Sequence, residues 1–188
     1  MKKKQLTPLL RQYLEIKEEY KECLIFFRLG DFYELFFQDA EIAAKELNIT
    51  LTKRGQINGK DIPMCGVPFF QGETYLARLL KKGFKVAICE QMERPEDSKK
   101  RGHKEIIKRK VVRIATPGTL TEEKELESPE NNYLASIICI EKIFCLGWID
   151  ISTGEINLKN CRDRDNITST IDEVGPSEII YCSEYLDK

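Results

Sequence analysis

The spacing of apolar residues predicts a helix and then a buried strand at the start of the chain. Over residues 8–20 apolar side chains recur at helical spacing, directly after Thr7-Pro8, a pair typical of a helix N-terminus. Residues 24–29, LIFFRL, form a continuous apolar run closed by Gly30. A short run of this kind, bounded by a turn signal, predicts a strand in the core.

Residues 32–48, FYELFFQDAEIAAKELN, carry an apolar stripe at helical spacing and predict one long helix. Asp31 and Glu34 have the N-cap and N3 spacing of a capping box, with Phe32 packed inward. A second interpretation stays open. Aromatic rings are more numerous here than one side of a small core requires, and a ring at the first position of a helix can protrude.

The remaining pattern up to residue 118 alternates between extended and helical segments. We predict a strand over 48–55, a polar hairpin or loop over 56–63, an irregular segment over 63–73, a helix over 74–83 and strands over 84–91 and 106–116. The predicted fold class is therefore α/β, with a mixed β-sheet flanked by helices in a domain of residues 1–118.

A composition change marks the predicted end of this domain. Residues 119–130, TLTEEKELESPE, hold five glutamates and a proline, which predicts an acidic linker. Residues 131–188 then predict paired strands, a helix and a final strand. This second unit has little to cover its sheet, so we expect an incomplete domain from a longer protein.

Composition narrows the function classes. The chain is 41% hydrophobic and 32% charged with a net charge of −1, so nucleic-acid binding would depend on local charge. No run of about 18 apolar residues and no signal peptide is present, and we expect a cytoplasmic protein without a membrane span. Seven cysteines without a CxxC pair and a single histidine argue against a zinc site and histidine catalysis.

Two basic segments are candidates for phosphate contacts. Residues 99–113 hold eight Lys or Arg against one Glu. Strand alternation would place Lys108 and Lys110, with Arg113 as a further candidate, on the opposite face from Arg109 and Val111, and such residues suit phosphate contacts. Lys53 and Arg54 end a predicted strand before a glycine. Each segment could equally be a solvated loop or an exposed strand end.

Two enzymatic interpretations find little support. GQINGKD (55–61) is one residue short of a phosphate-binding P-loop and places Asp61 where Ser or Thr is required. A magnesium-dependent nuclease would need clustered carboxylates, for which Glu15, Asp61 and Asp97 are available, but no predicted strand brings them together.

Six blocks together carry a family resemblance. TPLLRQYLEIK, FFRLGDFYELFFQDA, LTKRG, IPMCGVP, VAICEQ and RKVVRIATPGT occur in this order, and with them the chain resembles the N-terminal part of the bacterial MutS family of DNA mismatch-repair proteins. The resemblance implies a mismatch-recognition domain followed by the start of an RNase H-like α/β connector domain. It also implies a homodimeric parent protein that recruits MutL and binds ATP and magnesium in a domain outside this chain. No cofactor and no catalytic residue are expected in residues 1–188.

The resemblance assigns roles to particular residues. The family's Phe-x-Glu motif matches Phe32 and Glu34, and its basic positions match Lys53, Arg54 and Arg109. It implies that Phe32 inserts from the minor groove at a mismatched or unpaired base and kinks the duplex. Glu34 would accept a hydrogen bond from that base, or donate one if protonated, and would repel intact duplex.

One position departs from the family pattern, and one other function class remains open. Phe69-Phe70 stands where the family usually has an aromatic-His pair. The alternative function is a protein-interaction module of a repair protein, which would have no preference for mismatched DNA.

Overall fold

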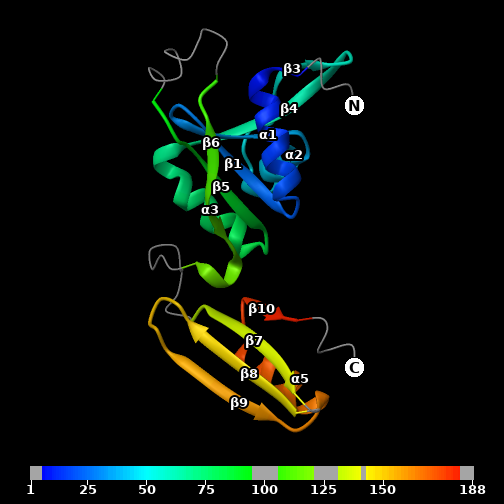
Figure 1. The fold of residues 1–188 in the computed structure, drawn as a ribbon, viewed down its shortest axis with the longest axis vertical. Coiled ribbons are helices and arrows are strands. Elements are labelled where there is room, and N and C mark those ends of the chain that lie inside the picture. Colours follow the sequence, from blue (N-terminus) through cyan, green and yellow to red (C-terminus); the bar gives the residue numbers. More distant parts are fainter. Residues whose placement is uncertain (1–5, 95–105, 121–130, 141–142, 183–188) are drawn as a thin grey trace. The chain divides into compact units, whose positions relative to one another are not determined.

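The computed structural model describes residues 6–94, 106–120, 131–140 and 143–182 (Figure 1). Contacts divide the chain into two compact units, residues 1–115 and 116–188. The predicted boundary at residue 118 lies three positions beyond this division, and most of the predicted acidic linker lies outside the described residues. Among the described helices, none has the length and apolar character needed to cross a membrane.

The first unit is a six-stranded mixed sheet with three α-helices. Its sheet order is β3-β4-β2-β1-β5-β6, in which β1 and β5 are parallel and the other pairs antiparallel. The strands are β1 (Cys23–Leu29), β2 (Phe32–Phe36), β3 (Thr52–Ile57), β4 (Lys60–Pro68), β5 (Lys85–Gln91) and β6 (Arg109–Ala115). The helices are α1 (Pro8–Glu19), α2 (Phe37–Leu47) and α3 (Gly72–Lys81), with a 3-10 turn η2 (Phe69–Gln71) before α3. The predicted α/β fold class is confirmed.

The helix predicted from residue 32 is wrong in its first five residues. Phe32–Phe36 is strand β2, and α2 begins only at Phe37, whose φ of 55° turns the chain sharply. Asp31 therefore caps no helix, and the capping box with Glu34 does not form. The strand prevails because β2 pairs with both β1 and β4, and these two ladders outweigh the local helical spacing.

The segment around the predicted hairpin is more regular than its composition indicated. β3 and β4 are joined at Asn58-Gly59, where both residues have positive φ, as a two-residue hairpin turn requires. The stretch 55–61 is therefore part of a hairpin. β4 then continues through residues 63–68, which were predicted to be irregular, because β2 pairs with it along this length.

A buried carboxylate joins α1, α2 and β1. Asp39 accepts hydrogen bonds from the Tyr13 hydroxyl at 2.8 Å and the Ile25 amide at 3.1 Å, and Lys17 pairs with its other oxygen at 2.8 Å. Its side chain is only 4% exposed. Burial, and then the charge of Asp39, raises the pKa of Tyr13. Tyr13 also belongs to the core cluster through which α1 covers one face of the sheet.

The second unit has the predicted order of elements. Strands β7 (Tyr133–Ile140), β8 (Ile143–Asp150) and β9 (Ile156–Cys161) form antiparallel pairs, α5 (Arg164–Val174) follows, and β10 (Glu178–Tyr181) returns parallel to β7. The unit begins with a 3-10 turn, η3 (Pro117–Thr119). Asp163 caps α5 by accepting from the Asn166 amide at 2.8 Å. The sheet order is β10-β7-β8-β9.

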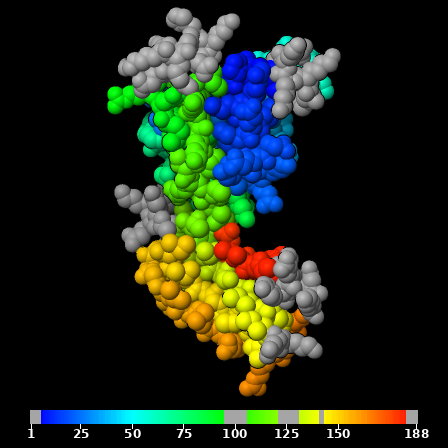
Figure 2. Space-filling model, viewed as in Figure 1, coloured from blue at the N-terminus to red at the C-terminus, as the bar shows by residue number. Residues whose placement is uncertain are grey.

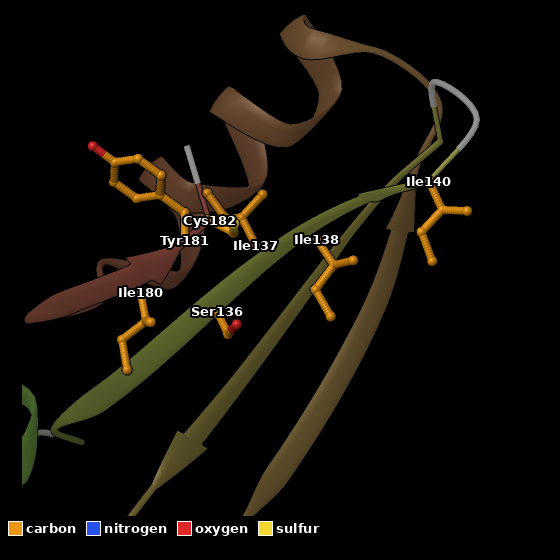
Figure 3. Close-up of a pocket in the computed structure, with 7 residues that line it drawn as sticks. All are labelled: Ser136, Ile137, Ile138, Ile140, Ile180, Tyr181 and Cys182. Carbon is orange, nitrogen blue, oxygen red and sulfur yellow. The ribbon is translucent and has the colours of Figure 1, made fainter. Parts of the chain in front are cut away.

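One face of this second sheet is apolar and exposed. Figure 3 shows Ser136, Ile138, Ile140 and Ile180 pointing away from the side on which α5 lies, at the edge of a cavity of about 470 Å³. No helix among the described residues covers this face.

Replacing Asp39 with alanine should destabilise the first unit strongly. Asp39→Ala leaves the buried Ile25 amide without its acceptor and leaves the Tyr13 hydroxyl only the Phe36 carbonyl, at 3.3 Å. Lys17 keeps only the Cys23 carbonyl, and loss of one member of a buried ion pair costs about 3–5 kcal/mol. Urea titration of residues 1–188, followed by circular dichroism, measures the change. Glu46→Ala, which removes a surface pair with Lys82, is the control and should change stability far less. Equal effects would mean that the Asp39 network contributes nothing beyond a surface pair.

Candidate nucleic-acid interface

Phe32 lies at the end of the first sheet, where a side chain can reach a ligand. It is the first residue of β2, opposite Leu29 on β1 and Pro68 on β4, and it is 47% exposed. Phe69 and Phe70 follow Pro68 directly and are 44% and 81% exposed. Three exposed rings therefore stand within one corner of the sheet, which the packing of the core does not require.

Tyr33 anchors the strand that presents Phe32. Its ring is buried on the opposite face of β2, within 5.3 Å of the Phe26 ring centroid, and its hydroxyl donates a hydrogen bond to Glu90 on β5. A Cβ atom at Gly72 would come within 2.7 Å of this ring, so only glycine allows α3 to approach so closely. Burial and the bond to Glu90 raise the pKa of Tyr33. Because alternate strand residues face opposite ways, anchoring Tyr33 inward turns Phe32 outward.

Glu34 lies on the same face as Phe32 and is held by Arg54. The Arg54 Nη1 atom lies 2.5 Å from the Glu34 Oε2 atom, across β4 from β3 to β2. The Glu34 side chain is 15% exposed and that of Arg54 44%. Gly66 on β4 lies between them, where a Cβ atom would contact the Glu34 Cγ atom at 3.5 Å. The absence of a side chain there leaves room for the ion pair to lie over the strand.

Arg109 shares this face but is turned inward. Its guanidinium donates to the Arg28 carbonyl at 2.6 Å, the Ile107 carbonyl at 2.9 Å and the Gln12 side chain at 3.0 Å, and it lies 4.8 Å from the centroid of the Phe27 ring. Burial is the main cause that lowers its pKa. In Figure 2 the green surface of β6 lies beside the blue surface of α1, where the bond to Gln12 is made. Arg109 thus joins β6 to β1 and α1.

The other basic side chains of β6 point away from this face. Lys110 lies opposite Glu90 of β5 in the sheet register, and the register shift between Val111 and Arg113 brings Arg113 to the same side as Lys110. The predicted alternation, with Lys110 and Arg113 opposite Arg109, therefore holds along β6. Lys108, just before the strand, and Lys110 are both exposed. The segment 95–105, which contains much of the basic run, lies outside the described residues.

Among the described residues, the carboxylates considered for a nuclease lie on different elements, Glu15 on α1 and Asp61 on β4. Lys53 pairs with Asp61 at 2.8 Å, which raises the pKa of the lysine and lowers that of the carboxylate. Gln56 donates to the same carboxylate. Glu15 lies on α1, and Asp97 lies outside the described residues. Across the described part of the chain, no group of three or more acidic, His or Cys residues is placed to hold a metal ion.

The sequence interpretation missed Arg28, which lies near the centre of this corner. Its guanidinium carbon lies 3.1 Å from the centroid of the Phe69 ring, and its Nε atom donates to the Gly30 carbonyl at 2.5 Å. Met92, at 55% exposure, also went unnoticed. A signal for Arg28 was present in the sequence, since a lone cation ends the apolar run of residues 24–29 just before a glycine turn.

The comparisons with known proteins agree across nearly the whole chain. The family model for MutS domain I matches residues 7–124, and that for MutS domain II matches residues 132–188. Similar relatives include proteins named DNA mismatch repair protein MutS from Ruegeria pomeroyi, 49% identical over 95% of this chain, and Anaplasma phagocytophilum, 51% identical over 93%. One from Wolbachia pipientis is 47% identical over 98%.

These relatives are much longer than this chain. The matched region is 20% of the Ruegeria protein, 21% of the Anaplasma protein and 22% of the Wolbachia protein. The chain therefore spans about a fifth of the length of the curated relatives it matches.

Removing the Arg109 guanidinium should weaken the joint between β6, β1 and α1. Arg109→Met keeps the aliphatic length but leaves two backbone carbonyls without their donor, and we expect the free energy of unfolding to fall by about 1–3 kcal/mol. The same urea titration measures it, with Lys110→Met on the exposed side of the same strand as control. If both variants unfold alike, the three hydrogen bonds of Arg109 do not stabilise the sheet.

Proposed function

Since this chain belongs to the MutS family, we propose that it recognises mismatched or unpaired bases in duplex DNA as part of a longer mismatch-repair protein. The observation that carries the proposal is the exposed Phe32 ring at the corner of the sheet, next to a carboxylate held on the same face. A phenylalanine whose only role was to fill the core would be buried, whereas the Phe32 ring is 47% exposed on a strand that is held in place by its neighbours.

The physical problem is to find a mispair without reading a sequence. A mismatch keeps its phosphates, and its groove pattern differs from one mispair to another. What mispairs share is weak stacking and easy deformation, and proteins read deformability as energy. Inserting an apolar wedge into the minor groove unstacks a base step at a cost of a few kcal/mol. A mismatch lowers that cost, and the difference is the recognition signal.

Phe32 is the proposed wedge. Stacking of an aromatic side chain on a base contributes about 1–3 kcal/mol and requires no particular base identity. Anchoring of Tyr33 supports this role, because a wedge that is already ordered loses less conformational entropy on insertion. Phe70, more exposed than Phe32 but outside the sheet, is proposed to border the site.

Glu34 is proposed to interrogate the loosened base. An ionised carboxylate only accepts hydrogen bonds, so it would select a base N–H exposed by mispairing. The same charge repels the phosphates of intact duplex, which penalises binding where no wedge can enter. The ion pair with Arg54 supports this role in part, since it fixes the carboxylate on the Phe32 face before DNA arrives.

The basic residues are proposed to position the DNA backbone. Lys53, Arg54, Lys108, Lys110 and Arg109 would contact or support contacts to phosphates, which fix register without reading sequence. Because Arg54 is paired with Glu34, it can contact a phosphate only if its guanidinium binds both groups or if the phosphate displaces Glu34. Arg109 already donates to three protein groups, so we propose that it acts mainly by holding β6 and its exposed lysines in place.

Further properties are proposed for the longer protein. We propose that it acts in the cytoplasm as a homodimer, recruits MutL, and binds ATP and magnesium in a domain outside residues 1–188. This chain is proposed to bind DNA and not to be an enzyme itself. The alternative, a docking module for another repair protein, predicts no mismatch preference and no dependence on Phe32.

Phe32→Ala should abolish the preference for mismatched DNA. Loss of the stacking energy should weaken mismatch binding roughly 5- to 100-fold while matched binding changes little. The measurement is a gel shift with matched and mismatched duplexes, using a chimera in which residues 1–188 replace the matching fifth of the Ruegeria relative. Leu51→Ala, which removes an equally exposed apolar side chain next to the end of β2 farthest from Phe32, is the control. A preference that survives Phe32→Ala would exclude the wedge.

Glu34→Ala should raise the affinity of the chimera for matched duplex. Removing the carboxylate ends its repulsion of phosphates and frees Arg54, and we expect a roughly two- to fivefold gain, the scale of one exposed charge interaction. The same gel shift measures it, with Glu46→Ala as control. In an Arg54→Met background the part of the gain that comes from freeing Arg54 should vanish. Unchanged matched affinity in Glu34→Ala would argue against the repulsive role.

A further inference from the structure

Arg28 closes the turn that precedes Phe32. Its Nε atom donates to the Gly30 carbonyl at 2.5 Å, which bridges the β1–β2 connection from within. Gly30 has a φ of 58°, a conformation that glycine adopts freely and that by itself leaves the turn weakly constrained. The hydrogen bond from Arg28 constrains the Gly30-Asp31 turn, and this turn sets the direction in which β2 begins.

The same guanidinium fastens this turn to Phe69, in the segment that follows β4. Its central carbon lies 3.1 Å from the centroid of the Phe69 ring, a stacked cation–π contact. The Phe69 amide in turn donates to the Asp31 carbonyl at 2.8 Å. The turn at Gly30-Asp31 is thus joined to Phe69 through both a ring and a backbone hydrogen bond, and Phe32 lies between the two joined segments.

Arg28 is poorly placed to touch DNA itself. Its side chain is only 15% exposed, and one face of its guanidinium is covered by Phe69. The guanidinium carbon also lies 5.7 Å from the Tyr33 ring centroid, and the Nη1 atom lies 4.0 Å from a Glu90 carboxylate oxygen. A phosphate anchor presents its N–H donors to solvent, whereas the Nε–H of Arg28 is bonded to the Gly30 carbonyl and its Nη1 atom lies near Glu90.

We infer that Arg28 is a positioning residue that fixes the outward orientation of Phe32 by clamping the β1–β2 turn against Phe69. The inference rests on the proposed wedge role of Phe32. Its physical basis is that a ring held in its inserting orientation avoids the entropy cost of ordering at the moment of binding. Arg28 therefore sets the selectivity for mismatched over matched duplex without contacting either.

The first test compares variants of Arg28 in the chimera by gel shift. Arg28→Met keeps the side-chain length and the apolar contact with Phe69 but removes the donor, and Arg28→Lys keeps the charge without the flat stacking group. We expect the mismatched-to-matched affinity ratio to fall by about tenfold in Arg28→Met, within the range of coupling between neighbouring residues, and by less in Arg28→Lys. Affinity for matched duplex should stay within about twofold, because no direct contact is lost.

A matched control separates positioning from general loss of stability. Arg78 makes contacts of the same kinds away from the site, donating to the Leu47 carbonyl at 2.8 Å and lying 5.6 Å from the Tyr75 ring centroid. Arg78→Met should leave the affinity ratio unchanged. In residues 1–188, amide exchange at Phe69, whose N–H donates to Asp31, should accelerate in Arg28→Met and not in Arg78→Met.

A double-mutant cycle with Phe32 decides whether Arg28 acts through the ring. In a Phe32→Ala background, Arg28→Met should cause no further loss of affinity for mismatched duplex. Additive losses, or equal losses for matched and mismatched duplex, would overturn the inference in favour of a direct contact with DNA. If Phe32→Ala removes discrimination but Arg28→Met preserves it, only this inference fails. If Phe32→Ala preserves discrimination, the proposed wedge role of Phe32 fails with it.

Discussion

The pairing of β2 between β1 and β4 is the constraint on which the candidate interface depends. Two antiparallel ladders fix which side chains of the five-residue strand face inward, and a shift of one residue would exchange them all. Because Tyr33 is buried against Gly72, Phe32 and Glu34 are both directed to the face that α1 also occupies. The ring then falls at the end of the sheet and the carboxylate beneath it, within reach of Arg54.

The electrostatics of the corner explain how a chain with a net charge of −1 could approach DNA. Most of the charged groups there are already paired: Glu34 with Arg54, Asp61 with Lys53, and Arg109 with backbone carbonyls and Gln12. Side chains that are already paired within the protein attract phosphates only weakly. They would contact DNA by exchanging their protein partner for a phosphate. This is consistent with a protein that must bind intact duplex weakly, because a strongly basic surface would hold every site alike.

Much of the fold could be predicted from the sequence, and the errors have a common cause. The helix after Thr7, the strand at 24–29, the hairpin around Asn58-Gly59 and the β-β-β-α-β order of the second unit follow from local signals. The helix predicted for FYELF was wrong because the helical spacing continues into α2, while the strand depends on pairing with β4, whose residues lie 28 to 36 positions away. Arg28 and the inward turn of Arg109 were missed for the same reason, since their partners lie on other elements.

The central claim is that the Phe32 ring itself enters the duplex at a mismatch, and fluorine NMR on the ring tests this most directly. The chimera would carry 4-fluorophenylalanine in place of Phe32, and its fluorine resonance would be followed as matched or mismatched duplex is added. The account predicts a large ring-current shift with mismatched duplex, from stacking on a base, and little change with matched duplex. The same shift with both duplexes, or no shift with either, would contradict it.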